Sequence, residues 1–198
     1  MSRAHDLDRV WAEGDDPYGY RTRWYEARKR ALLMAVLPRQ RFVHGWEIGC
    51  ANGELTAALA LRCDHLLGTD QHPRAVAVAR QRCGALGHVR VERMEHPGAW
   101  PDGRFDLVVV GEMAYYLEPG ELSPFARGVA ARLAPGGVLV ACHWRPDFGA
   151  RRCATGEVHA TLGAQRGLVR LARYEDEDML LDCWSSDAAS VAMREGLR

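Results

Sequence analysis

The chain has 198 residues, of which 47% are apolar and 26% charged, so it is long enough for one substantial core in a single globular domain. Its formal net charge is zero, which argues against a global field that recruits nucleic acid or an anionic membrane. No stretch approaches eighteen apolar residues, and the first residues lack the apolar segment of a signal peptide. The six cysteines form no C-x-x-C pair and the histidines share no ligand spacing, so we expect a cytoplasmic protein with no metal site.

The first forty residues predict a helical arm ahead of the rest of the fold. Residues 5–16 are polar and helix-compatible, turn residues break the pattern at 15–20, and helical spacing resumes over 21–37 until Pro38 ends it. The second helix carries basic and aromatic residues that could contact nucleic acid, but an amphipathic helix with a solvated face is the favoured interpretation. These residues are Arg21, Arg23, Trp24, Tyr25, Arg28, Lys29 and Arg30.

From residue 41 onward, short apolar runs alternate with helical patterns, which is typical of a doubly wound α/β fold. We predict strands near 43–48, 65–69, 88–93, 105–111 and 137–143, and helices near 54–62, 73–84, 119–134 and 155–164. Two further runs, 167–174 and 179–184, flank an acidic turn and predict an antiparallel hairpin. The expected fold is a mostly parallel, seven-stranded, Rossmann-like sheet with a core at 41–145, an acceptor-side segment and hairpin at 146–184, and a tail at 185–198.

The first predicted strand runs into a glycine loop that has the position of a nucleotide cradle. Gly49 and Gly53 are four residues apart with Ala51 between them, so the loop is not the G-x-G-x-x-G motif of dinucleotide-binding folds, and binding of a pyrophosphate is disfavoured. Glu47 before the loop and Glu54 after it suit a ligand that carries an ammonium or sulfonium. S-adenosylmethionine (SAM) fits this description, while an ordinary strand-to-helix turn is the alternative.

Two more strand ends carry residues that could hold an adenosine. Asp70, at the end of the second strand, could accept both ribose hydroxyls, with Gln71 beside the adenine. Met94 could lie on the adenine ring and Glu95 could accept from its amino group. The alternatives are that Asp70 caps the following helix and that Glu95 is an ordinary surface residue.

The fourth and fifth strands end in residues that predict a reactive centre. Glu112, Tyr115 and Tyr116 follow the buried run 105–111, at the sheet edge where open α/β folds place their active sites. One of the two tyrosines is expected to be a core residue. His143 ends the fifth strand and is the candidate general base, with Glu112 and Tyr115 as orienting groups; a structural histidine is the equally open alternative.

In combination these motifs resemble the class I SAM-dependent methyltransferases, and within them the nodulation protein S (NodS) group. The resemblance covers about residues 40–145 and is strengthened by the Gly-Cys-Ala-x-Gly loop, Asp16-Pro17 and the Tyr25-Glu26 helix. In that group the methyl acceptor is the free amine of a deacetylated terminal sugar in a chitin-type oligosaccharide. The resemblance therefore implies N-methylation of a small-molecule or amino-sugar acceptor by a monomer or homodimer.

The resemblance also assigns cofactor contacts to positions of this chain. The arm would close over SAM through Tyr18 and Tyr25, with Arg23 as a candidate partner for its carboxylate. The remaining implied cofactor-binding residues are Glu47, Gly49, Cys50, Ala51, Gly53, Asp70, Gln71, Met94, Glu95, Glu112 and Met113.

Other activities remain as alternatives or are disfavoured by the motifs. O-methylation of a small-molecule natural product and a non-catalytic partner protein with a SAM-type fold remain open. A nucleic-acid methyltransferase would carry Asp/Asn-Pro-Pro-Tyr/Phe after its fourth strand, and the sequence from Gly111 to Tyr115 lacks it. The glycine spacing disfavours a nicotinamide oxidoreductase.

Overall fold

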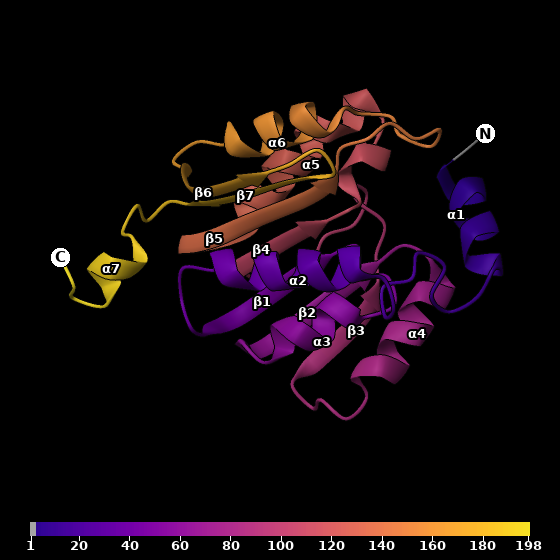
Figure 1. The fold of residues 1–198 in the computed structure, drawn as a ribbon, viewed down its shortest axis with the longest axis horizontal. Coiled ribbons are helices and arrows are strands. Elements are labelled where there is room, and N and C mark those ends of the chain that lie inside the picture. Colours follow the sequence, from indigo (N-terminus) through magenta and orange to yellow (C-terminus); the bar gives the residue numbers. More distant parts are fainter. Residues whose placement is uncertain (1–2) are drawn as a thin grey trace.

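A seven-stranded sheet forms the centre of the computed structural model, which describes residues 3–198 (Figure 1). The strand order is β3-β2-β1-β4-β5-β7-β6, in which β7 is antiparallel to both of its neighbours and the other pairs are parallel. The predicted fold class, including the C-terminal antiparallel hairpin, is confirmed. The strands are β1 (Phe42–Ile48), β2 (Cys63–Asp70), β3 (Val89–Arg93), β4 (Phe105–Gly111), β5 (Leu133–Trp144), β6 (Val169–Glu175) and β7 (Met179–Ser185).

Most helices lie where the sequence pattern places them, with small differences at their ends. The arm contributes α1 (Arg3–Ala12) and α2 (Trp24–Val36); the second begins three residues later than predicted and ends before Pro38. A 3-10 turn, η1 (Ala114–Tyr116), follows β4. The other helices are α3 (Glu54–Ala60), α4 (Pro73–Cys83), α5 (Pro119–Arg132), α6 (Thr155–Gly163) and α7 (Val191–Arg194).

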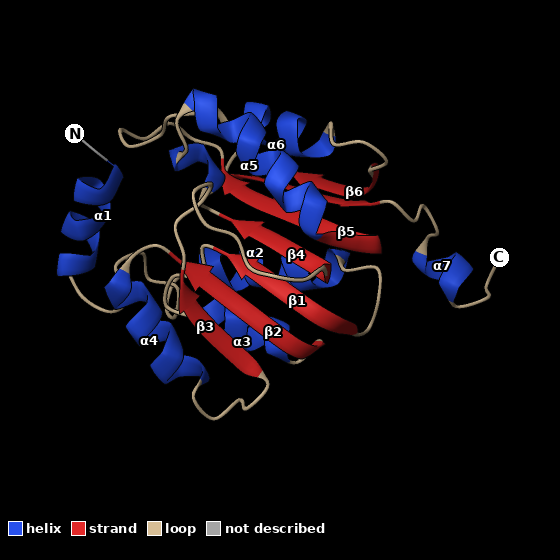
Figure 2. Cartoon of the chain, turned by 180° about the vertical axis from the view of Figure 1, so that it is seen from behind, coloured by secondary structure: helices blue, strands red, loops and turns tan. Residues whose placement is uncertain are grey.

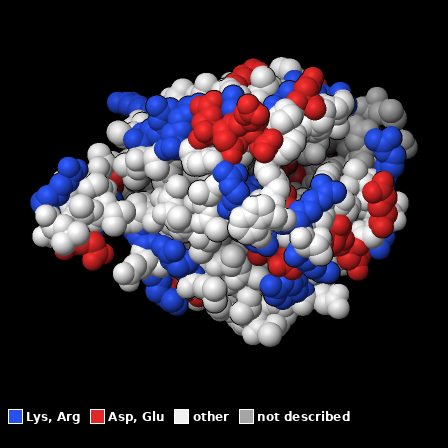
Figure 3. Space-filling view, in the orientation of Figure 1, with Lys and Arg blue, Asp and Glu red and all other residues white. Residues whose placement is uncertain are grey.

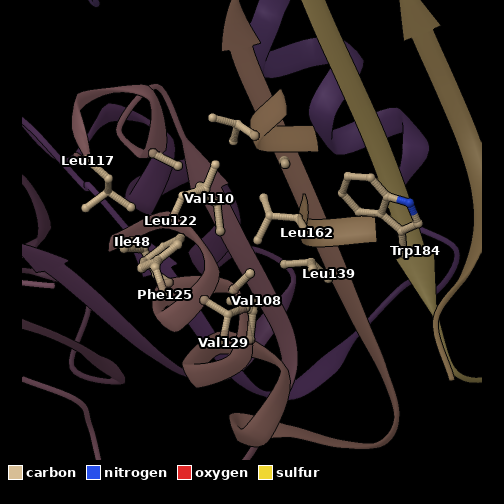
Figure 4. Close-up of a cluster of buried hydrophobic side chains, with 14 of the residues drawn as sticks. Ile48, Val108, Val110, Leu117, Leu122, Phe125, Val129, Leu139, Leu162 and Trp184 are labelled. Atoms are coloured by element: carbon tan, nitrogen blue, oxygen red, sulfur yellow. The ribbon is translucent and has the colours of Figure 1, made fainter. Parts of the chain in front are cut away.

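Helices cover both faces of the sheet, as Figures 1 and 2 show from opposite sides. Alternate residues of β4 point to opposite faces: Leu107 and Val109 belong to the core beneath α2 and α3, whereas Val108 and Val110 belong to the core beneath α5 and α6. Because both faces are buried, the strand reads as a continuous apolar run. Figure 4 shows the core beneath α5 and α6, in which side chains of β4 and β5 pack against those of the two helices.

The connection between β3 and β4 replaces a covering helix with aromatic side chains. Residues 94–104 contain no helix, and Trp100 from this segment packs against Trp46 and Phe125 with ring centroids 6.2 and 5.9 Å away. Gly128 on α5 makes room for that indole, because a Cβ at this position would lie 2.1 Å from the ring. A large aromatic side chain therefore fills the space that a helix would otherwise occupy.

The C-terminal end leaves the sheet after β7. Ser185 still belongs to the strand, and the predicted tail then carries the short helix α7, which lies apart from the sheet in Figure 1. Within the described residues no helix is both long and apolar enough to span a bilayer. Acidic and basic side chains are interspersed over the face shown in Figure 3, which matches the balanced net charge.

Candidate functional site

A cavity of about 570 Å³ opens at the carboxyl ends of the parallel strands. Strand ends and the segments after them form one wall, and α1, α2 and the loop between them form the other. Most of the residues singled out from the sequence line this cavity: Tyr18, Arg23, Glu47, Gly49, Cys50, Ala51, Asp70, Gln71, Met94, Glu112, Met113 and Tyr115. Gly53, Glu95 and His143 lie outside its lining.

The glycine loop has the backbone geometry that its glycines suggest. Gly49 and Gly53 have φ values of 79° and 82°, in the left-handed region that glycine adopts without strain. A Cβ at Gly49 would lie 2.9 Å from Met113, and a Cβ at Gly53 would lie 3.0 Å from the backbone of Ala79. Gly49 thus lets the loop approach the end of β4, whereas Gly53 serves close packing of the loop on α4.

Glu47 is a buried carboxylate at the floor of the cavity. Its side chain is 1% exposed, and the hydroxyl of Thr56 donates to Oε2 over 2.6 Å. Burial raises the pKa of Glu47 to about 8, although the Thr56 hydrogen bond acts in the opposite direction. A cationic ligand group placed beside it would favour the ionised form.

Asp70 connects the end of β2 to the glycine loop. Its Oδ2 accepts from the backbone N–H of Ala51 over 3.0 Å, and its Oδ1 accepts from the N–H of His72 over 2.8 Å. The N-cap residue of α4 is His72, so Asp70 is not the helix cap that the sequence offered as an alternative. Each carboxylate oxygen keeps a lone pair for a ligand hydroxyl.

The second acidic residue of the loop is already paired within the protein. Glu54 accepts from Arg82 over 2.8 Å and from Arg21 over 3.2 Å. Burial raises the pKa of Glu54, but the hydrogen bonds from Arg82 and Arg21 outweigh it and lower the pKa. Glu54 thus lies beside the site as expected, but Arg21 and Arg82 compensate its charge, and these ion pairs join the arm to α3 and α4.

Glu112 is the hub of the opposite end of the cavity. Its backbone has φ = 55°, which is unusual for a residue other than glycine, and three donors hold its carboxylate. Lys29 Nζ donates to Oε1 over 3.0 Å, while the Tyr115 hydroxyl and the Trp144 backbone N–H donate to Oε2 over 2.6 and 2.8 Å. The carboxylate is thus fixed in place, which suits an orienting group.

Lys29 is a site residue that the sequence analysis missed. It also forms an ion pair with Glu26 over 2.9 Å, and both of these side chains are less than 10% exposed. Burial opposes the charged form of Lys29, but the carboxylates of Glu112 and Glu26 outweigh it and raise its pKa. The only available signal was the Glu26–Lys29 spacing, which places the two on one helical face.

Aromatic residues from the arm complete the walls of the cavity. Tyr20 and Tyr25 lie within 6 Å of the Lys29 ammonium, and Tyr25 stands edge-on to Trp144. Among the described residues, the buried hydroxyl of Tyr25 has no hydrogen-bond partner. Trp11 of α1, which also lines the cavity, stacks on His72 with ring centroids 5.6 Å apart. Neither Trp11 nor Tyr20 was expected from the sequence.

His143 lies behind the cavity wall, fully buried. Its Nε2 accepts from the backbone N–H of Ala114 over 3.3 Å, and its Nδ1 is 3.0 Å from Nε2 of His159. Burial, followed by the neighbouring His159, holds the pKa of His143 well below its usual range. Because both nitrogens are occupied and neither reaches the cavity, this position argues against the expected role of general base.

Comparisons with known proteins agree with one another. The family model for Nodulation protein S (NodS) matches residues 2–160. The Nodulation protein S of Bradyrhizobium diazoefficiens is 30% identical over 128 residues, which is 64% of this chain and 61% of that protein. The chain matches between about half and two thirds of the length of three curated relatives of this kind.

Two solved structures extend the similarity to the fold. A protein of Pseudomonas syringae assigned as a methyltransferase is 45% identical, with a TM-score of 0.74 over 82% of this chain and 99% of that one. The N-methyltransferase NodS of Bradyrhizobium japonicum WM9, solved with S-adenosyl-L-homocysteine (SAH), is 29% identical with a TM-score of 0.82. That match covers 91% of this chain and 96% of the other.

Proposed function

This chain belongs to the nodulation protein S (NodS) family, and from that premise we propose that it transfers a methyl group from SAM to the amine of a small molecule or amino sugar. One observation carries the proposal. Acidic groups at two strand ends, Glu47 and Asp70, share a single cavity with the Glu112 cluster. A donor held by the first pair would point its methyl group toward an acceptor beside the second.

The donor end has the chemistry of an aminoacyl-adenosyl ligand. Asp70 offers a carboxylate to the ribose hydroxyls, and Glu47 offers one to the ligand's ammonium. Met94 and Gln71 line the same end and would contact the adenine. The structurally similar NodS of Bradyrhizobium japonicum WM9 was solved in complex with SAH, so the same ligand class is proposed here. The arm would cover it from the side of Trp11 and Tyr18.

The acceptor end combines flat aromatic walls with a few polar groups. Tyr20, Tyr116, Trp144 and Phe148 line it, and rings of this kind present broad apolar surfaces with a polar edge on tyrosine. The acidic groups Glu26 and Glu112 outnumber the one lysine between them, which favours a neutral or cationic acceptor. An amine or amino sugar matches this surface better than a carboxylate does.

The reaction needs alignment more than covalent catalysis. The lone pair of the acceptor attacks the methyl carbon of the sulfonium in line with the breaking C–S bond, and positioning within a few ångströms supplies most of the rate. An alkylammonium has a pKa of about 10.4 and no lone pair, so the acceptor must lose a proton first. Glu112 is fully engaged by three donors, so its part is to orient the acceptor.

Lys29 itself is protected from methylation by the same charges that place it here. The two carboxylates beside it keep the ammonium protonated, and a protonated amine cannot attack a methyl group. The proposed enzyme therefore carries an amine beside its reactive centre without consuming its own cofactor on it.

We further propose that the protein works in a reducing compartment such as the cytoplasm. All six cysteines lie in the described part of the chain and are free, buried thiols. Buried thiols that form no disulfide are typical of proteins kept in reducing surroundings.

Two experiments test the function. Calorimetry with SAH and with NAD separates the ligand classes: we expect binding of SAH alone, and absence of SAH binding overturns the proposal. A screen of primary amines, amino sugars, phenols and carboxylates with labelled SAM then tests the acceptor. We expect amines to turn over faster as pH rises, because deprotonation supplies the lone pair. Turnover of phenols alone would establish O-methylation instead.

A further inference from the structure

A buried chain of hydrogen bonds lies behind the wall of the cavity. His159 Nδ1 lies 2.8 Å from Asp182 Oδ2, His143 Nδ1 lies 3.0 Å from His159 Nε2, and the Ala114 N–H reaches His143 Nε2 over 3.3 Å. The three side chains are no more than 3% exposed. Burial of polar side chains costs folding free energy unless hydrogen bonds compensate for the lost contacts with water. A buried set of three connected polar side chains therefore suggests a structural or functional role.

The secondary structure accounts for the alignment of the chain. In the β5–β7 ladder Asp182 pairs with Ala141, two residues before His143, so the side chains of Asp182 and His143 point to the same face of the sheet. Helix α6 covers that face (Figure 1). His159 of α6 lies between the two side chains, within hydrogen-bond distance of each. Three separate elements thus supply one continuous series of contacts.

The two ends of the series fix the direction of every hydrogen bond. The backbone N–H of Ala114 can only donate, and the carboxylate of Asp182 can only accept. Each histidine between them must therefore carry its hydrogen on Nδ1 and present a lone pair on Nε2. Any other tautomer would leave two hydrogens or two lone pairs facing each other.

At the His143 end, the series contacts the turn η1, which follows Glu112 at the proposed acceptor site. Ala114 begins η1, directly after Glu112 and Met113, and the ring of Tyr115 packs on His143 with centroids 5.1 Å apart. The Tyr115 hydroxyl in turn donates to Glu112. Any displacement of the Ala114 amide would therefore move the groups that line the acceptor end.

At the other end of the series, Asp182 lies close to two arginines of β6. Asp182 has Arg173 at 3.6 Å and Arg170 at 3.8 Å, both on the edge strand β6, so its charge is compensated. Within the described residues its other oxygen, Oδ1, accepts no hydrogen bond. Two partly exposed arginines thus compensate the charge of buried Asp182 at this end of the series.

We propose that Asp182, His159 and His143 form a positioning relay that fixes the Glu112–Tyr115 turn for methyl transfer, an inference that rests on the proposed function of that site. His143 acts through the Ala114 amide and does not touch the acceptor. Its part is that of a positioning residue, because a misplacement of about 1 Å at a reacting centre can lower a rate about 100-fold.

The unaltered protein provides the first test. Long-range nitrogen–proton correlation spectra of the imidazoles at neutral pH report which nitrogen carries the hydrogen, and spectra of His143→Gln and His159→Gln assign the two signals. We expect both histidines in the Nδ1–H form. An Nε2–H tautomer or an imidazolium at either position overturns the relay, whether or not the protein methylates anything.

Kinetics of two variants provide the second test. His143→Leu removes the acceptor for the Ala114 amide, whereas the side-chain oxygen of His143→Gln can still accept from it. With the amine selected by the screen, we expect kcat of His143→Leu to fall about 10- to 100-fold at unchanged SAH affinity, and His143→Gln to recover most of it. The relay is contradicted if His143→Leu keeps the wild-type kcat, or if both variants lose kcat equally. If no amine is methylated, the proposed function fails, and the imidazole spectra alone test the relay.

Discussion

Lys29 on α2 donates to Glu112 at the end of β4 over 3.0 Å, and this contact ties the N-terminal arm to the carboxyl edge of the sheet. The side chains are 9% and 18% exposed, so little solvent screens the pair. Lys29 is the chain's single lysine among 26 basic residues. One residue therefore links the arm to the sheet and compensates part of the acidic charge of Glu26 and Glu112.

Removing that charge should destabilise the fold. Lys29→Met removes the ammonium that pairs with the carboxylates of Glu26 and Glu112 in a buried site, and loss of one partner of a buried ion pair costs about 3 kcal/mol. Urea denaturation measures the change. The exposed pair Arg41–Asp64, at 64% and 41% exposure, provides the control: Arg41→Met should cost less than about 1 kcal/mol. Equal losses in the two variants would mean that the Lys29 cluster is not a buried network.

Glu47 should make stability fall as pH rises. Its folded pKa of about 8 lies above its ordinary value of 4.5, so the folded state retains the proton that the unfolded chain has released. This contribution is complete below pH 4.5 and is lost as pH rises toward 8, at no more than about 1.4 kcal/mol per pH unit. The isosteric variant Glu47→Gln removes the effect. Urea denaturation of both proteins should give similar free energies below pH 4.5 that diverge as pH rises toward 8, with the wild type becoming the less stable of the two; parallel curves contradict the shift.

Asp70 should be required for the cofactor. Asp70→Ala removes the carboxylate proposed for the ribose, and a hydrogen bond to a charged group contributes about 1.5–3 kcal/mol, so SAH affinity should fall about 10- to 100-fold. Calorimetry measures the loss.

Asp106 is a matched control at the opposite edge of the sheet. Its carboxylate also accepts two backbone N–H groups, from Val43 and His44 over 2.9 and 2.8 Å. Asp106→Ala should therefore retain wild-type SAH affinity. Unchanged affinity in Asp70→Ala would place the cofactor elsewhere, and equal losses in both variants would show a general effect of removing such a carboxylate.

Tyr25 and Tyr115 should respond differently to loss of their hydroxyls. The Tyr25 hydroxyl is buried without a partner among the described residues, so Tyr25→Phe should leave stability unchanged or raise it. If the acceptor takes that hydroxyl as its partner, kcat/KM for the amine falls while SAH affinity is retained.

Tyr115→Phe, by contrast, removes the 2.6 Å hydrogen bond to Glu112 and should lower the free energy of unfolding by about 1.5–3 kcal/mol. Denaturation curves of the two variants with the wild type check this contrast. A stability loss in Tyr25→Phe as large as that in Tyr115→Phe would show that the Tyr25 hydroxyl has a partner in solution.

The sequence by itself determined the sheet, its strands and the edge at which the site lies. Apolar runs such as 105–111 identify buried strands, and the glycines at 49 and 53 mark a tight loop, in which both have positive φ values and leave little room for a Cβ. Because parallel strands all end at one edge, Glu47, Asp70 and Glu112 could be expected to lie together.

Only the tertiary structure decided what each polar side chain does there. Glu54 follows the glycine loop and could contact a ligand by its position in the sequence. In the structure, two arginines from distant elements pair with its carboxylate. Lys29 reads as part of a solvated helical face but is buried by the packing of α2 on the sheet. His143 lies near the carboxyl end of β5, but the Ala114 N–H and His159 of α6 occupy its two nitrogens. Local pattern fixes the backbone and the face of each residue, whereas its partners depend on contacts between elements far apart in the sequence.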